Sequence, residues 1–130
     1  MRSVDSLPHD DLPRQFDNRD ALEATLRQLF PQAPGGLSPI LGGRRAAETA
    51  LAAIDPAAYG RSRNHLDGAV TRLSPHIRHG VLSLAEVREA VFAWLERSGQ
   101  PPVAAQKLIN ELGWRDYWQR LWRQLGDGIW

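Results

Sequence analysis

The chain has 130 residues, of which 42% are hydrophobic and 24% are charged, and its net charge is +1. This composition is typical of one soluble globular domain with a modest core, not of a disordered or membrane chain, and the charge gives no overall basic field that would indicate nucleic acid. The absence of cysteine excludes disulfides, thiolate metal sites and cysteine nucleophiles. The first residues lack the apolar core of a signal peptide, and no apolar run has membrane-spanning length, so we expect a cytoplasmic protein.

The first third of the chain predicts an arm, one helix and a loop. Residues 1–16 are polar and contain two prolines, which is typical of an arm or linker. Asn18 is a suitable N-cap for a helix whose leucines recur at helical spacing, and Pro31 ends that helix. A loop rich in proline and glycine follows. We therefore expect residues 1–41 to form one region and residues 42–130 a second, helical one.

The middle of the chain is the least regular part. A short alanine-rich helix is expected over residues 44–54, and Asp55-Pro56 punctuates the chain after it. The basic stretch that follows, residues 59–80, shows no clear periodicity. Within it, Ser74 followed by proline indicates an N-cap and the first position of a helix.

Two longer helices are predicted in the C-terminal half. Ser83 and Glu86 form a capping box that opens a helix, and Gly99 closes it. The longest helix is expected to run from Pro102 to about Leu125. Its apolar residues occupy two faces, one formed by Ala105, Leu108, Ile109 and Leu112, the other by Trp114, Tyr117, Trp118, Leu121 and Leu125. Such a helix is expected to be buried between layers or to line a cavity. No strand alternation is visible, so the predicted fold class is all-α.

A first candidate site follows Gly68. The hydroxyls of Thr71 and Ser74, the guanidinium of Arg72 and the free N–H groups of a helix start are together suited to an anion such as a pyrophosphate. The alternative is a capped helix that binds nothing, because serine is a common N-cap.

A second candidate lies on the longest predicted helix. Glu111, Trp114 and Arg115 share one stripe, so a carboxylate that can bind a base edge lies beside an indole that can stack on bases. The alternative is a core tryptophan beside a surface ion pair between Glu111 and Arg115. Tyr59 and Arg63, one helical turn apart, are suited to a ligand and a phosphate, or are a loop tyrosine and a solvated arginine.

The order of these segments resembles the FAD-binding domain of the DNA photolyase/cryptochrome family. That family carries a phosphate-binding segment of Thr-Ser-Arg-Leu-Ser-Pro type, then a serine-capped helix, then a helix reading Glu-Leu-x-Trp-Arg-Glu-Phe/Tyr. The chain has Val70-Thr71-Arg72-Leu73-Ser74-Pro75, Ser83, and Glu111-Leu112-Gly113-Trp114-Arg115-Asp116-Tyr117. The resemblance covers about residues 42–125 and implies an all-α, partial flavin-binding domain without the family's antenna-binding α/β domain.

The resemblance also implies roles for individual residues. The residues implied to bind FAD, chiefly through its phosphates, are Tyr59, Val70, Thr71, Arg72, Leu73, Ser74 and Arg115. Those implied to contact DNA containing a flipped pyrimidine dimer are Arg63, Glu111, Trp114, Arg115 and Trp118. In this family, light-excited reduced FAD donates the electron that splits the dimer, so no side chain here is expected to be catalytic and no metal is expected.

The chain departs from the family pattern in three respects. Val70-Thr71 replaces Thr-Ser, which removes one hydroxyl, and neither the antenna domain nor the later helices that complete the flavin pocket have counterparts in the sequence. We therefore expect a fragment or shortened member of a light-driven DNA-repair protein, inactive as a lyase by itself, with weak or absent FAD binding. We also expect self-association through exposed apolar surface. The alternatives are a non-repair, cryptochrome-like light sensor and a degenerate, non-catalytic binding module.

Overall fold

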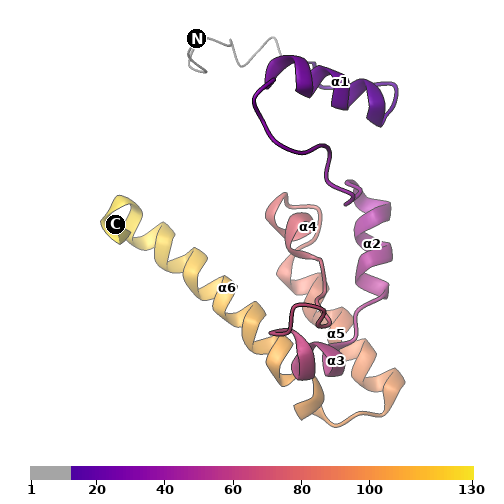
Figure 1. Ribbon diagram of the computed structural model, residues 1–130. Helices are drawn as coiled ribbons and strands as arrows, with labels where there is room; N and C mark the ends of the chain where they lie inside the picture. Colours follow the sequence, from indigo (N-terminus) through magenta and orange to yellow (C-terminus); the bar gives the residue numbers. More distant parts are fainter. Residues whose placement is uncertain (1–12) are drawn as a thin grey trace. The chain divides into compact units, whose positions relative to one another are not determined.

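The computed structural model describes residues 13–130, and these residues form helices and connecting loops with no strand. The chain divides into two compact units, Met1–Ile40 and Leu41–Trp130, one residue away from the expected boundary. In chain order the helices are α1 (Arg19–Leu29), α2 (Arg44–Ala52), α3 (Pro56–Ser62), α4 (Ser74–Arg78), α5 (Leu84–Ser98), the 3-10 turn η2 (Pro102–Ala105), α6 (Gln106–Leu125) and the 3-10 turn η3 (Gly126–Ile129) (Figure 1). The all-α prediction is confirmed.

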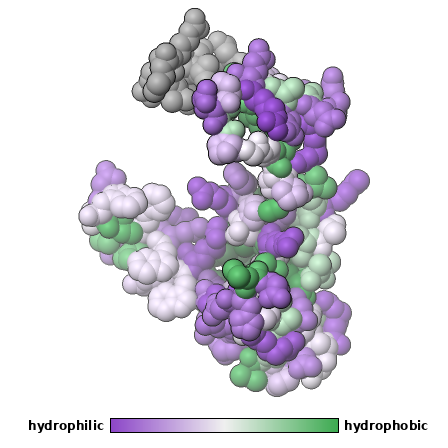
Figure 2. Space-filling view, viewed as in Figure 1, coloured by the Kyte–Doolittle hydropathy of each residue, from purple (hydrophilic) through white to green (hydrophobic). Residues whose placement is uncertain are grey.

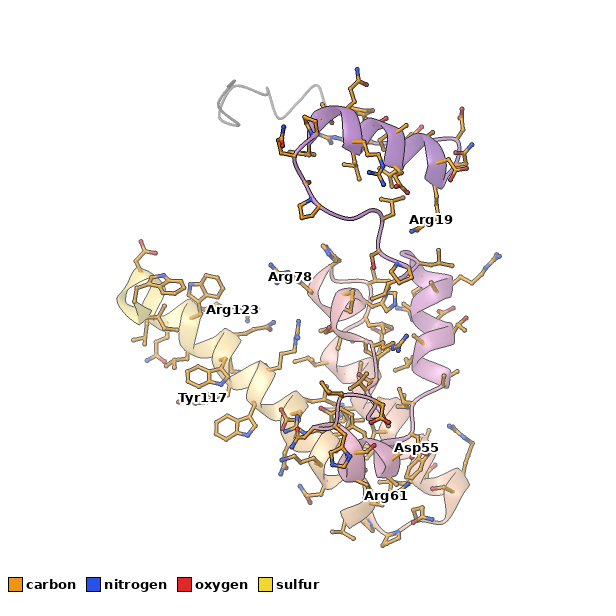
Figure 3. The ribbon with its side chains drawn as sticks, in the orientation of Figure 1. Arg19, Asp55, Arg61, Arg78, Tyr117 and Arg123 are labelled. Carbon is orange, nitrogen blue, oxygen red and sulfur yellow. The ribbon has the colours of Figure 1, made fainter. Side chains whose placement is uncertain are left out.

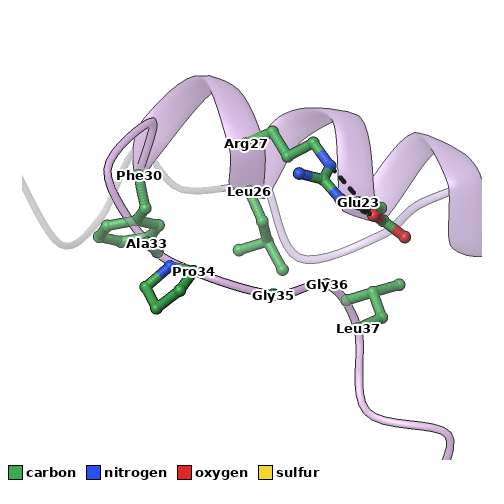
Figure 4. A pocket seen from close by; sticks show the side chains of 9 residues that line it. All are labelled: Glu23, Leu26, Arg27, Phe30, Ala33, Pro34, Gly35, Gly36 and Leu37. Atoms are coloured by element: carbon green, nitrogen blue, oxygen red, sulfur yellow. Dashed lines mark hydrogen bonds and ion pairs between the residues drawn. The ribbon is translucent and has the colours of Figure 1, made fainter.

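The described part of the first unit consists of α1 and the loop that follows it. The Oδ1 atom of Asn18 accepts a hydrogen bond from the N–H of Ala21 at 2.9 Å, so the predicted N-cap is confirmed. The helix ends at Leu29, and Phe30 is its C-cap directly before Pro31, as predicted. The loop folds back along α1 and leaves a hollow of about 180 Å³ beside Leu26 and Phe30 (Figure 4).

The core of the second unit combines side chains from α2, α5, η2 and α6 with three residues of the connecting segments. The buried hydrophobic residues are Ala47, Ile54, Leu73, Leu82, Val87, Val91, Ala105 and Leu108. Helix α6 packs against α3, η2 and α5, and α5 also packs against α2. The core therefore fixes α3, the segment around Leu73 and the first half of α6 relative to one another.

Helix α6 has the two faces that the sequence predicts, but the second face is not buried. Ala105 and Leu108 lie in the core, whereas Trp114, Tyr117 and Trp118 keep 56%, 50% and 54% of their surface exposed. Figure 1 shows the C-terminal half of α6 running clear of the other helices of its unit, and Figure 2 shows pale and green side chains along it. Among the described residues, the first half of this helix packs in the core, and its aromatic second half projects and provides exposed apolar surface.

Two local expectations are corrected. Asp55-Pro56 does not merely punctuate the chain but begins α3, where the Oδ1 atom of Asp55 accepts from the N–H of Ala58 at 2.9 Å and Pro56 occupies the first turn. Ser74 is not an N-cap: it is the first residue of α4, whose cap position is Leu73 and has no side-chain hydrogen bond. Leu73 takes the cap position because its side chain is drawn into the core.

The N-terminus of α5 has the predicted capping box and a charge partner that the sequence did not reveal. Glu86 Oε2 accepts from the N–H of Ser83 at 2.7 Å, and Ser83 Oγ accepts from the N–H of Glu86 at 3.1 Å. Arg44 Nη2 lies 2.6 Å from Glu86 Oε1 and joins α2 to α5. The Ser83 backbone hydrogen bond, followed by the hydrogen bond from Arg44, lowers the pKa of Glu86 from 4.5 to about 2.

This shift predicts a specific dependence of stability on pH. Because the folded-state pKa of Glu86 lies below its ordinary value, its carboxylate stabilises the fold fully above about pH 5, and the contribution disappears as the pH falls from 4.5 through 2. Glu86→Gln keeps an acceptor for the capping box but has no charge to lose. We expect the difference in urea midpoint between wild type and Glu86→Gln, followed by circular dichroism, to shrink over this range. A difference that stays constant from pH 6 to pH 2 would contradict the role of the charge.

Candidate functional site

Four of the residues implied to bind FAD meet at one cavity of the second unit. The cavity has a volume of about 270 Å³. It is lined by Ala50, Ala53, Ile54, Asp55, Tyr59, Ala69, Val70, Thr71 and Arg72. The structure therefore brings Tyr59 from α3 beside the 70–72 segment, as a shared ligand would require, whereas Leu73, Ser74 and Arg115 do not line this cavity.

Close backbone approach holds the 70–72 segment against α3. A Cβ atom added to Gly68 would lie 1.7 Å from the carbonyl oxygen of Ser62, so only glycine fits there. The N–H of Gly68 donates to the carbonyl oxygen of His65 at 3.1 Å, and the N–H of Ala69 donates to Ser62 Oγ at 2.9 Å. The end of α3 thus fixes where the cavity wall begins.

This contact predicts opposite outcomes for one substitution at two glycines. Gly68→Ala should lower the free energy of unfolding by more than about 1 kcal/mol, because the backbone of α3 must move. Gly113→Ala, in the interior of α6, should raise it by roughly 0.5–1 kcal/mol, since the added Cβ meets no atom within 4 Å and alanine is the better helix former. Chemical denaturation gives the free energy of unfolding of each variant relative to wild type. Equal effects of the same sign would contradict the close approach at Gly68.

Arg72 is the most unusual residue of the cavity wall. Its φ of 54° is the only positive φ at a non-glycine residue among those described. Such left-handed backbone is strained for a residue with a Cβ and tends to occur where function requires it. The turn places Arg72 at the cavity while the next residue, Leu73, is 1% exposed in the core.

The anion site expected at the start of α4 is weaker than the sequence indicated. The helix has only five residues, and the hydroxyl of Ser74 makes no capping bond. Thr71 Oγ1 accepts from the N–H of Leu73 at 3.4 Å, so part of its bonding capacity is already used. The side chain of Leu73 belongs to the core, which leaves only its backbone for a cofactor. Of the groups expected to bind an anion, the exposed side chain of Arg72 is therefore the one that this structure leaves most available.

A second cluster joins this cavity to α6. Arg63 Nη1 donates to the hydroxyl of Tyr59 at 3.3 Å, and the guanidinium lies 5.6 Å from the centre of the Tyr59 ring. Arg63 Nη2 also lies 2.8 Å from Glu111 Oε1. The hydrogen bond with Tyr59, and after it the carboxylate of Glu111, raises the pKa of Arg63 above its ordinary value. Tyr59, which lines the cavity, is thus linked through Arg63 to the carboxylate of Glu111 on α6.

The partners of Glu111 differ from those that the sequence offered. Its Oε1 atom pairs with Arg63 and, at 3.9 Å, with Nζ of Lys107; none of the described ion pairs joins it to Arg115. The surface pair considered for Glu111 and Arg115 is therefore wrong. Both cations approach the Oε1 atom of Glu111. The Oε2 atom accepts no hydrogen bond from any described residue. A carboxylate with one free oxygen can still accept a hydrogen bond from a base.

The aromatic residues of α6 form an open platform. Tyr117 packs edge-on against Trp114 at 5.8 Å and against Trp118 at 5.3 Å between ring centres. Figure 3 shows Tyr117 on the projecting half of α6. Trp114 is not the core residue of the alternative interpretation, since 56% of its surface is exposed. Its ring is available for stacking, and Tyr117 holds it in place from the side.

Arg115, which the resemblance assigns to both FAD and DNA, has a partly buried guanidinium. Its Nε atom is buried and has no hydrogen-bond partner among the described residues, as is also true of Nε of Arg63. A buried donor without a partner is unfavourable unless a ligand or water satisfies it. Because both Nε atoms are buried, a ligand could reach them only after the surrounding side chains move.

Sequence reasoning missed two residues of the site. Asp55 lines the cavity, and Lys107 shares Glu111 with Arg63. For Asp55 the sequence does contain a signal: aspartate followed by proline is a common start of a helix, and here it places Asp55 at the N-terminus of α3. The position of Lys107 beside Arg63 depends on the packing of α3 on α6, which no local feature of the sequence predicts.

Two further classes of site find no support among residues 13–130. Within this part of the chain, no group of three or more histidine, cysteine or acidic side chains could hold a metal ion. Its helices also include none with the length and apolar character needed to cross a membrane. Comparison with protein-family models, with curated proteins and with solved structures gives no match.

Proposed function

We propose that this chain forms part of a FAD-dependent, light-driven DNA-repair domain of the photolyase type, with pyrimidine dimers in DNA as the substrate. The proposal starts from the order of the two sequence motifs. It is supported by the fold, because residues assigned separately to cofactor and to DNA lie in one helical unit. A DNA substrate is also in keeping with the cytoplasmic location expected from the sequence.

The observation that carries the proposal is the linked group of Tyr59, Arg63 and Glu111. Tyr59 lines the cavity, Arg63 contacts its hydroxyl, and Glu111 pairs with Arg63. A repair site must hold its cofactor close to the lesion, since the flipped base has to reach it. This group connects the two binding regions through direct contacts.

The cavity fits the phosphates of FAD better than the whole molecule. Arg72 supplies a cation that forms no ion pair with any described residue, and Tyr59 lines the same cavity. Against this, the carboxylate of Asp55 also lines the cavity, and 270 Å³ is below the roughly 300–1,000 Å³ of drug-sized ligand pockets. Arg72 and Tyr59 would therefore hold a phosphate portion, and reduced FAD, when bound, supplies the electron that opens the dimer.

The remaining residues of the proposed site act on the DNA. Trp114 offers a flat face to a flipped base, and Oε2 of Glu111 accepts a hydrogen bond from its edge. Arg63 keeps the Glu111 carboxylate in place and is close enough to the surface to meet a phosphate. These residues bind and orient the lesion and do not themselves break bonds.

The small cavity favours a second candidate, a non-catalytic binding module related to this family. Such a module would keep a phosphate-binding wall without holding flavin. A cryptochrome-like light sensor is the third candidate, and it requires flavin but no preference for damaged DNA. The three differ in two measurable properties, FAD binding and lesion preference.

The direct test compares the affinity of the 130-residue chain for a duplex with one thymine dimer and for the same duplex without it. Repair function requires tighter binding to the damaged duplex, at one salt concentration, since phosphate contacts alone favour neither. If the damaged duplex is then illuminated with blue light in the presence of the chain and reduced FAD, loss of the thymine dimer shows whether the dimer is split. Equal affinities for both duplexes would reject lesion recognition and leave the sensor or the binding module.

FAD binding itself gives a further prediction. We expect the chain to bind FAD weakly, without retaining it through purification, because the cavity accommodates only part of the cofactor. Arg72→Gln should weaken this binding by about 1.5–3 kcal/mol through loss of a charge-assisted contact to phosphate. Fluorescence titration of FAD measures both, and Arg78→Gln, an exposed arginine of α4 outside the cavity, is the matched control. An equal effect of the two substitutions would show only general charge attraction.

A further inference from the structure

A second opening of the same unit lies between α3 and the start of α6, apart from the cavity at Arg72. It has a volume of about 380 Å³. It is lined by Ala57, Gly60 and Arg61 of α3 and by Gln100, Val103, Ala104, Gln106, Lys107 and Asn110. A Cβ atom on Gly60 would lie 3.7 Å from Cβ of Lys107, so the two helices approach closely at its base. Figure 3 shows Arg61 on α3.

The lining of this cleft combines small apolar residues with side chains that carry positive charge or amide groups. Arg61 and Lys107 are cations, Gln100, Gln106 and Asn110 carry amides, and no carboxylate lines the cleft. The ion pairs of the described residues include none with Arg61. Lys107 reaches Glu111 only at 3.9 Å, and Arg63 already lies 2.8 Å from the same oxygen. The positive charge of the cleft is therefore mostly uncompensated.

The amides are arranged to add hydrogen-bond donors. Gln106 Nε2 donates to Asn110 Oδ1 at 2.7 Å. This bond occupies the amide oxygen of Asn110 and leaves its NH₂ group free to donate. Two cations and free amide donors around an open cleft are the groups with which proteins bind phosphate oxygens.

We propose that this cleft binds phosphate groups of the DNA backbone and thereby holds the duplex beside Glu111 and Trp114. The inference extends the proposed function, because it takes DNA as the partner. Lys107 and Glu111 are one turn apart on α6, about 6 Å along the helix axis, so the cleft continues directly into the group formed by Arg63 and Glu111. Arg61, Lys107 and Arg63 then follow one line of phosphates along the strand.

The backbone of a long polyanion suits this cleft better than a small phosphate compound. The side chain of Lys107 is 49% exposed, and the cations lie along the border of two helices rather than around an enclosed pocket. Such open cations contribute sequence-independent binding that weakens as salt displaces them.

The experiment measures binding of an undamaged duplex to the 130-residue chain at several salt concentrations. For Arg61→Gln/Lys107→Gln we expect the slope of log affinity against log salt to fall by about 2, and the affinity near 0.1 M salt to fall by roughly tenfold or more. Arg45→Gln/Arg97→Gln removes the same charge from exposed positions outside the cleft and should change the slope much less. Arg61→Lys changes the side chain but keeps the charge, and it should retain the wild-type slope. This result would show that the slope of the double variant falls because charge is lost and not because the fold is disturbed.

Three results would overturn the proposal. One is an unchanged slope in the double variant, and another is an equal loss in the control pair. The third is a loss of binding to inorganic pyrophosphate with duplex binding unchanged, which would make the cleft a small-anion site. Parallel titrations with a dimer-containing duplex give the ratio of damaged to undamaged affinity and test the lesion preference separately, so failure of the proposed function can be distinguished from failure of this cleft.

Discussion

Leu73→Ala is expected to lower the free energy of unfolding by about 2–5 kcal/mol, the range for leucine-to-alanine changes at buried positions. Leu73 is 1% exposed and packs in the core between α2, α5 and α6. The substitution removes buried apolar surface and leaves a cavity, since neighbours fixed by several helices close it only partly. For a domain of this size, such a loss is a large part of the total stability.

The same change should also weaken the phosphate binding that we propose for Arg72. The strained backbone of Arg72 is held on one side by Gly68 against α3 and on the other by the anchored side chain of Leu73. Urea denaturation gives the stability of Leu73→Ala, and pyrophosphate titration gives the effect on the cavity. Leu66→Ala, at a fully exposed position in the preceding loop, should stay within about 0.5 kcal/mol of wild type. Comparable destabilisation by the two variants would contradict the anchoring role of Leu73.

The sequence predicts those features of the fold that depend on neighbouring residues. The N-cap at Asn18 and the capping box of Ser83 and Glu86 were predicted because each needs a side chain and a backbone group only three residues apart. Gly99 ends α5 in the left-handed conformation with φ 62°, as a glycine at that place predicts.

The errors arise where tertiary packing decides between two local options. Ser74-Pro75 satisfies the local rule for a helix start, but burial of Leu73 moves the cap position back by one residue. The aromatic face of α6 is a different case: periodicity predicts that the face is apolar, but it contains no information on whether another layer covers it. Helix α3 was missed because its seven residues are too few to show a period.

The candidate site was predictable as single residues but not as contacts. Tyr59, Arg63 and Glu111 could each be nominated from the sequence, because the resemblance to the photolyase/cryptochrome family implies a binding role for each of them. That Arg63 rather than Arg115 pairs with Glu111 follows from the packing of α3 on α6, between residues 48 positions apart. A local rule favours the partner four residues away, and the structure shows that the distant one prevails.

Trp114→Ala is expected to reduce the affinity for a dimer-containing duplex by about 1–3 kcal/mol, which is roughly 5- to 150-fold. The physical reason is loss of the flat, exposed ring on which a flipped base stacks. Affinity for the undamaged duplex should not change, because it rests on phosphate contacts. Trp122→Ala is the matched control, since Trp122 is equally exposed on the same helix, two turns further along.

Glu111→Gln should change the affinities for the undamaged and the damaged duplex by different amounts. Its carboxylate partly neutralises Arg63 and Lys107, so an amide in its place frees both cations, and affinity for the undamaged duplex should rise, most clearly at low salt. Binding of the damaged duplex gains the same phosphate attraction but loses the acceptor strength of an ionised oxygen toward the base edge. The ratio of damaged to undamaged affinity should therefore fall even as the overall affinity increases. Fluorescence anisotropy with both duplexes at two salt concentrations gives this ratio. If it stays at the wild-type value in both Glu111→Gln and Trp114→Ala, these residues do not recognise the lesion, because a reader of damaged bases cannot lose its acceptor and its stacking surface without losing its preference.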